Sequence, residues 1–306
     1  VKNITASRNL GKLYFAENDF SRARHYLSMT MNSNQENIDK QSSNLETDTL
    51  EAQFLECLFH LKEYEHFNSV LYQLSKRSKP IQRVAAMSAY AAHQLDQEDI
   101  YPFCPNPMNF VTVGNLDHLT DDAPKLLNSI GLEMDLKHGV WEPRNRTTKR
   151  GYQTMDNLFQ SPSIPMLQLL SAIKNELDRF HSRFKTKQCV FMDRWPTDIS
   201  LRGWFVKMLE GGHQDSHCHP GGWLSGVVYL KTIDNPIENE GAIELGLHGF
   251  NYPVLKADFP HRLHQPRDGD IILFPSSLLH RTVPVKRETE RCVIAFDLIQ
   301  REGFSS

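Results

Sequence analysis

A cluster of histidines and one aspartate, followed directly by an apolar segment, constrains the fold of this chain more than any other feature. His213, Asp215, His217 and His219 occupy alternate positions within seven residues, and an apolar stretch follows over 223–230. In an extended chain, alternation places these four side chains on one face. Crowded imidazoles repel each other when protonated and gain little from packing. A bound divalent metal beside a strand is the simplest reason for the pattern.

The second part of the pattern lies further along the chain. The segment 269–280 is typical of a turn, a buried strand and a loop that carries His280, and 291–299 predicts another strand with Arg291 at its start. Non-haem Fe(II) oxygenases hold their metal with two histidines and a carboxylate and leave positions open for co-substrate and oxygen. The histidine pair His217 and His219, the distant His280 and then Arg291 could supply such a metal site and a basic residue behind it.

At this point the sequence resembles the 2-oxoglutarate/Fe(II)-dependent oxygenases. The matching motifs are His217-Cys-His-Pro, the run Leu-Ser-Gly-Val-Val-Tyr-Leu over 224–230, Phe-Pro-Ser before His280-Arg-Thr-Val-Pro, and Glu-Arg at 290–291. The chain also resembles aspartyl/asparaginyl β-hydroxylase, which joins a helical-repeat domain to a similar catalytic domain and lacks the carboxylate ligand. The resemblance implies a double-stranded β-helix, a jelly-roll or cupin-like fold, with Fe(II) as metal and 2-oxoglutarate and O2 as co-substrates.

The resemblance implies that His217 and His280 are metal ligands, and it leaves the third position open. His219 stands where the family normally has Asp or Glu. His219 completes a three-histidine face, or it lines the site while water fills the position, or Asp215 supplies the carboxylate as part of a His-x-Asp of its own. A complex of Fe(II), neutral imidazoles and 2-oxoglutarate dianion is neutral, and one with a carboxylate is monoanionic. Charge alone therefore does not decide.

Arg291 is the candidate that anchors the distal carboxylate of 2-oxoglutarate, because a guanidinium donates two parallel hydrogen bonds to a carboxylate. Its alternative is a surface arginine paired with Glu288 or Glu290. The resemblance suggests further candidates for the co-substrate pocket, which are Met208, Tyr229, Ser225 and Thr282.

The first hundred residues predict a different kind of structure. Apolar positions over 10–27 and 55–74 fit two helix pairs of the tetratricopeptide type, a polar insert over 32–47 fits a loop, and 81–97 fits a further helix. Three prolines within 101–108 forbid a continuing helix, so we expect a helical domain over 1–100 and a catalytic domain over 101–306.

In the catalytic domain the sequence predicts helices over 121–130 and from Ser163 to Phe184, and then short strands separated by turns. The expected class is α+β, with helical repeats followed by the double-stranded β-helix. The predicted strands span 189–194, 201–209, 217–231, 241–247, 270–274 and 291–299.

Composition limits the functions to consider. The formal net charge is −3, which gives no reason to expect a nucleic-acid partner, and no apolar run reaches the ~18–20 residues of a membrane helix. Five scattered cysteines fit reduced thiols in a cytoplasmic protein. The favoured function is an Fe(II)- and 2-oxoglutarate-dependent dioxygenase that hydroxylates a peptide or protein side chain, or a small molecule, with release of succinate and CO2. The alternatives are a metal-dependent cupin enzyme that does not use 2-oxoglutarate, and a repeat-based binding module with a degenerate oxygenase domain.

Overall fold

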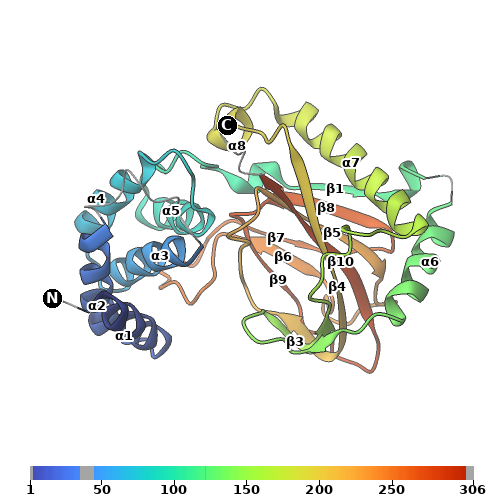
Figure 1. Cartoon of the computed structure of the whole chain (residues 1–306), viewed down its shortest axis with the longest axis horizontal. Helices are drawn as coiled ribbons and strands as arrows, with labels where there is room; N and C mark the ends of the chain where they lie inside the picture. The colour runs from blue at the N-terminus through green and yellow to red at the C-terminus, as the bar shows by residue number, and fades with distance from the viewer. Residues whose placement is uncertain (1–2, 35–44, 121, 301–306) are drawn as a thin grey trace. The chain divides into compact units, whose positions relative to one another are not determined.

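A computed structural model describes residues 3–34, 45–120 and 122–300. By their contacts the residues form two compact units (Figure 1). The first combines Val1–Pro105 with Phe250–Phe259, and the second combines Asn106–Gly249 with Pro260–Ser306. The structure therefore contains one helical unit and one mixed unit of helices and antiparallel sheets.

The helical unit contains five helices within its described residues, at positions close to those that apolar periodicity predicts. Gly11 lets the first two helices approach closely, because a Cβ there would lie 2.8 Å from the Leu27 side chain. The predicted loop over 32–47 lies mostly outside the described residues, and its two ends are helical. The helices are α1 (Ile4–Ala16), α2 (Phe20–Asn34), α3 (Leu45–His60), α4 (Tyr64–Ser75) and α5 (Gln82–Leu95).

The segment Phe250–Phe259 packs as part of this helical unit, although the chain on both sides of it belongs to the other unit. Gln94 of α5 is buried, and its side-chain amide forms hydrogen bonds with the main chain of the segment. Its Oε1 accepts hydrogen bonds from the amides of Leu255 (2.7 Å) and Lys256 (2.8 Å), and its Nε2 donates to the Lys256 carbonyl (3.0 Å). A long-range segment of this kind leaves no periodic signal in the sequence.

Asp48 of α3 is a buried carboxylate that costs the helical unit stability. Its Oδ1 has no hydrogen-bond partner within the described chain, and burial, reinforced by Glu51, raises the pKa of Asp48 to about 6. Because the pKa of Asp48 is higher in the folded state than in the unfolded state, the free energy of unfolding is greatest below the unfolded pKa of 3.8. It falls as the pH rises through about 6, where the buried carboxyl group loses its proton.

We therefore expect Asp48→Asn to stabilise the protein at about pH 7, by about 2 kcal/mol, and to change little at about pH 4. Urea unfolding of both proteins at the two pH values measures the difference. A variant that is less stable than the wild type at the higher pH would contradict this assignment.

The mixed unit holds two antiparallel sheets. The larger has the strand order β1-β8-β5-β10-β4-β3-β2, and the smaller has the order β7-β6-β9. This arrangement of antiparallel strands is consistent with a jelly-roll. The strands are β1 (Thr112–Asn115), β2 (Val140–Trp141), β3 (Thr148–Gln153), β4 (Ile199–Gln214), β5 (Leu224–Lys231), β6 (Ile243–Gly246), β7 (His261–His264), β8 (Asp270–Pro275), β9 (Leu279–Thr282) and β10 (Arg291–Gln300).

Strand β10 lies between β4 and β5 and separates two environments by alternation of its side chains. Cys292 faces the helix side, where it lines a cavity of about 510 Å³ together with Leu127 of α6 (Ala123–Asp135). Arg291 and Asp297 face the opposite side, where they contact Met208 and His219 respectively. The interior face of the sheet thus carries the charged residues of an otherwise apolar strand.

The remaining elements of this unit are helices. The predicted helix from Ser163 to Phe184 is confirmed, and the Ser163 hydroxyl caps it by accepting the Met166 amide at 3.3 Å. The helices are η2 (Pro107–Phe110), η3 (Leu116–His118), α6 (Ala123–Asp135), α7 (Ile164–Phe184) and α8 (Val190–Asp193). None of the helices in the described part of the chain is long and apolar enough to cross a membrane.

Three local predictions were wrong. The segment 189–194 is the short helix α8 rather than a strand, because Phe191 turns into an aromatic cluster with Phe180 and Trp223. The strand predicted over 217–231 begins only at Leu224, after a proline-glycine turn. His280 lies on strand β9 rather than in a loop.

Candidate active site

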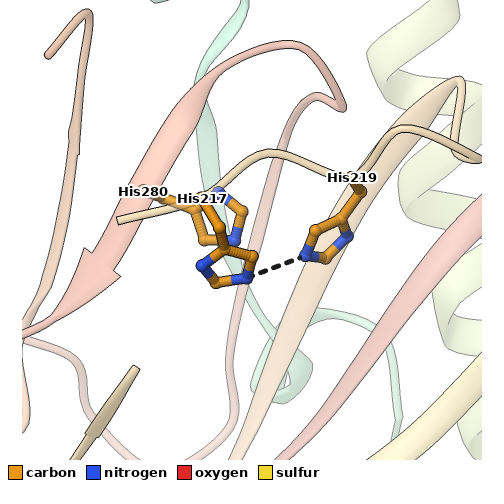
Figure 2. Close-up of side chains that lie close together, drawn as sticks. All are labelled: His217, His219 and His280. Carbon is orange, nitrogen blue, oxygen red and sulfur yellow. Dashed lines mark hydrogen bonds between the residues drawn. The ribbon is translucent and has the colours of Figure 1, made fainter. Parts of the chain in front are cut away.

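Three histidines converge inside the mixed unit. His217 and His219 lie in the connection between β4 and β5, and His280 lies on β9. One nitrogen of each ring lies within 4.8 Å of a nitrogen of the other two, and the three side chains point toward a common centre (Figure 2). The structure thus brings together the three histidines that the sequence singled out.

The main chain fixes this convergence. His217 and His280 form an isolated antiparallel bridge in which each amide donates to the other's carbonyl at 3.0 Å. The His219 amide donates to the Ser276 carbonyl at 2.9 Å. Because two connections of the sheet are tied together here, the triad does not depend on free loops for its geometry.

Each ring is held by an acceptor at Nδ1. That of His217 lies 2.7 Å from the Asp215 carbonyl, and that of His280 lies 3.1 Å from the Leu278 carbonyl. That of His219 lies 2.6 Å from Oδ1 of Asp297. We assign the tautomers from these partners: Nδ1 carries the proton in each ring and Nε2 carries the lone pair, which in His217 lies 3.5 Å from the Thr147 hydroxyl.

The distances between the rings then favour a metal. Nε2 of His217 lies 3.2 Å from Nε2 of His219 (Figure 2). With these tautomers neither nitrogen has a proton to share. Two imidazoles bound to one metal at right angles, with bonds of about 2.1 Å, would place their nitrogens about 3 Å apart. The pair therefore has the spacing of two ligands of one ion.

Burial keeps two of the imidazoles neutral. It lowers the pKa of His217 to about 3, with the neighbouring His219 adding to the effect, and it lowers the pKa of His280 well below 6.5. A metal competes with a proton for the same lone pair. At neutral pH these two rings are available as ligands without losing a proton first.

Arg291 forms the second centre of the site. Its guanidinium is buried, donates through Nε to the Gly241 carbonyl at 2.8 Å, and lies over the Tyr229 ring. Its Nη1 donates to the sulfur of Met208 at 3.7 Å. Within the described chain Arg291 has no carboxylate partner. The surface pairing considered for it is wrong, since Glu290 pairs instead with Lys207 at 2.6 Å.

A buried guanidinium without a counter-charge is costly unless an anion binds it. The Tyr229 hydroxyl is buried beside it and has no well-formed hydrogen bond in the described chain. Burial raises the pKa of Tyr229, so this hydroxyl is a protonated donor. The two groups together could donate hydrogen bonds to a carboxylate.

The other predicted site residues lie in three places. Met208 and Tyr229 contact Arg291, whereas Ser225 lies at the triad, with its Oγ 3.0 Å from Nδ1 of His219. Thr282 is buried on β9 and pairs across the sheet with Ile243.

The Asp215 carboxylate lies outside the triad. It faces His213 at 3.5 Å, and its side chain is 59% exposed. The residue that the sequence analysis missed is Asp297. A single acid inside an apolar strand, on the same alternating face as Arg291, was the signal for it.

Comparison with protein families agrees with this geometry. Residues 202–297 match the family described as "Putative 2OG-Fe(II) oxygenase". The matched segment contains the three histidines and Arg291. It is therefore an oxygenase domain that depends on Fe(II) and 2-oxoglutarate. No curated protein sequence matches this chain.

Several solved structures are similar to the chain. A prolyl-4-hydroxylase of Pseudomonas putida is 15% identical, with 70% of this chain and 100% of that chain covered and a TM-score of 0.44. HygX of Streptomyces hygroscopicus, solved with nickel and 2-oxoglutarate, is 17% identical, with 63% and 83% covered and a TM-score of 0.41. A prolyl hydroxylase of Trichoplax adhaerens, in complex with a hypoxia inducible factor peptide fragment, is 14% identical, with 70% and 89% covered and a TM-score of 0.44.

The residues present fit both groups that such a domain needs. Imidazoles suit Fe(II), and three of them leave further positions for a co-substrate. The unpaired guanidinium of Arg291 suits the carboxylate of 2-oxoglutarate that is remote from the metal.

Proposed function

We propose that the protein hydroxylates a side chain of a peptide or protein, with His217, His219 and His280 as the three iron ligands and Arg291 as the anchor of 2-oxoglutarate. Two features of the interior of the mixed unit carry the proposal. The Nε2 atoms of His217 and His219 lie 3.2 Å apart, and the buried guanidinium of Arg291 has no carboxylate partner in the described chain. A metal ion would bind the histidine nitrogens, and a dicarboxylate would pair with the guanidinium.

In this proposal each protein group has a limited role. The main-chain acceptors at Nδ1 hold His217 and His280 with Nε2 toward the metal, so little reorganisation is needed on binding. When bound, Fe(II) and 2-oxoglutarate supply the oxidising chemistry, with succinate and CO2 as products.

Co-substrate orientation falls to Arg291 and its neighbours. Arg291 would bind the remote carboxylate through its Nη atoms, and the Tyr229 hydroxyl would donate a further hydrogen bond. Met208 would contact the carbon chain. Thr282 and Ser225 remain further candidates for this pocket. A cupin that does not use 2-oxoglutarate would have no need for Arg291, which favours the oxygenase over that alternative.

A peptide or protein substrate is favoured by the helical unit. We propose that residues 1–100 form a domain of tetratricopeptide-like repeats and 101–306 the catalytic domain, because paired helices with a close glycine contact resemble that architecture. Stacked helix pairs present extended surfaces that suit peptides. We also propose a cytoplasmic location, supported by five cysteines that are scattered along the chain and odd in number, as is typical of reduced thiols.

The test of this function is turnover of 2-oxoglutarate. The full chain, given Fe(II), O2 and 2-oxoglutarate, is expected to form succinate slowly by itself and faster with matching members of an arrayed peptide library. Mass spectrometry should then find one added oxygen on the active peptides. Succinate without any peptide that accelerates it would argue for a small-molecule substrate, and no succinate under any condition would overturn the proposal.

A further inference from the structure

The third histidine differs from the other two in what holds it. Nδ1 of His217 and of His280 donates to a main-chain carbonyl, whereas His219 donates to the Asp297 carboxylate at 2.6 Å. Asp297 is the one side-chain carboxylate bonded to the triad in the described chain. A carboxyl group therefore lies directly behind the ring that occupies the position where related enzymes have a carboxylate ligand.

The Asp297 carboxylate is itself fixed. Its Oδ1 also accepts a hydrogen bond from the Ser225 hydroxyl at 2.7 Å, and Ser225 bonds in turn to the Ser276 hydroxyl at 2.8 Å. The Asp297 side chain is only 13% exposed. Three separate segments, β5, β10 and the turn after β8, thus converge behind one imidazole.

The chain makes room for this group with a glycine. A Cβ at Gly222 would lie 2.4 Å from the Ser276 hydroxyl and 3.1 Å from Cγ of Asp297. Any side chain at residue 222 would displace the acceptors behind His219. The close approach of the main chain at residue 222 to these acceptors therefore requires glycine.

We infer that Asp297 is a positioning residue for the metal: it holds His219 with Nε2 toward the ion and supplies, from behind the ligand, the negative charge that the missing carboxylate ligand would supply directly. The inference rests on the proposed three-histidine site. A carboxylate that accepts the N–H of a ligand imidazole fixes the tautomer and makes the ring a stronger donor to the metal. The charge of the site then matches that of a two-histidine, one-carboxylate centre.

The experiment measures Co(II) binding to the full chain without O2, with Co(II) as a spectroscopic substitute for Fe(II). The variants are Asp297→Asn, which keeps the shape and an acceptor oxygen, and Asp297→Ala. The matched control is Glu244→Gln, which removes a carboxylate from the pair with Arg281 on the smaller sheet. Thermal unfolding without metal shows whether each variant folds.

We expect Asp297→Asn to weaken Co(II) binding about 10-fold, and Asp297→Ala by up to about 100-fold, with the control within about twofold of the wild type. In proton NMR of the Co(II) form, each ligand Nδ1–H should give one paramagnetically shifted, exchangeable signal. In Asp297→Asn the signal of His219 should move or exchange away while the other two stay.

Equal Co(II) affinity of the wild type and both Asp297 variants, or three unchanged N–H signals in Asp297→Asn, would overturn the inference. If Asp297→Ala does not fold, the isosteric Asn variant decides alone. A wild type that binds no Co(II) would instead overturn the proposed three-histidine site. Failure of the inference and failure of the proposed function are therefore distinguishable.

Discussion

Replacing Arg291 with Leu is expected to weaken 2-oxoglutarate binding by about 100-fold or more while making the protein without ligands more stable. Loss of one partner of a buried charge pair costs about 2–5 kcal/mol of binding free energy. Without ligand, however, the guanidinium has no counter-charge within the described chain. An apolar side chain in its place avoids the cost of burying that charge and so stabilises the folded state. The opposite signs of the two effects are the signature of a ligand anchor.

The matched comparison for this prediction uses two further variants. Arg291→Lys keeps the charge and loses the two parallel hydrogen bonds, so we expect an intermediate loss of about 10-fold. Arg267→Leu removes an exposed arginine and should change neither property. Calorimetric titration with 2-oxoglutarate and urea unfolding measure the two quantities. An Arg291→Leu protein that is less stable and binds 2-oxoglutarate normally would show that Arg291 serves the fold alone.

Replacing His280 with Ala is expected to abolish metal binding, with a loss of Co(II) affinity greater than the ~10–100-fold typical of a residue behind a ligand. His280 is the least exposed residue of the triad and lies on the regular strand β9. Its main-chain bridge to His217 should therefore persist in the variant. The protein should therefore fold without a functional metal site.

Thermal unfolding with and without Co(II) tests this. Metal should raise the unfolding temperature of the wild type, because an ion that binds only the folded state stabilises it, and should not raise that of His280→Ala. His264→Ala is the control, since His264 pairs with Asp270 outside the triad. A metal-dependent rise in His280→Ala equal to that of the wild type would exclude His280 as a ligand.

The parts of the site that the sequence predicted are those with a local pattern. Alternation placed His217 and His219 on one side of the chain, and the motif around His280 identified the distal histidine. Arg291 begins a strand whose apolar run is unmistakable. Periodicity also located the long helix α7 and the helices of the first unit.

The parts that the sequence did not predict depend on contacts between distant segments. Asp297 reaches His219 only because β10 pairs with both β4 and β5. The segment Phe250–Phe259 joins the helical unit through Gln94, which no local pattern marks. Helix α8 replaces a predicted strand because Phe191 packs into an aromatic cluster formed by remote residues. Local propensity is a weak guide where tertiary packing decides.

The most direct test of the account is an anaerobic titration of the full chain with Fe(II) and 2-oxoglutarate, followed by visible absorption. The wild type is expected to develop the weak charge-transfer band of chelated 2-oxoglutarate, Arg291→Leu to require far more 2-oxoglutarate, and His280→Ala to show no band. Within the same series, His219→Ala should lose the band and Asp215→Ala should keep it. A wild type without the band, although metal is bound, would contradict the account and favour a cupin that does not use 2-oxoglutarate.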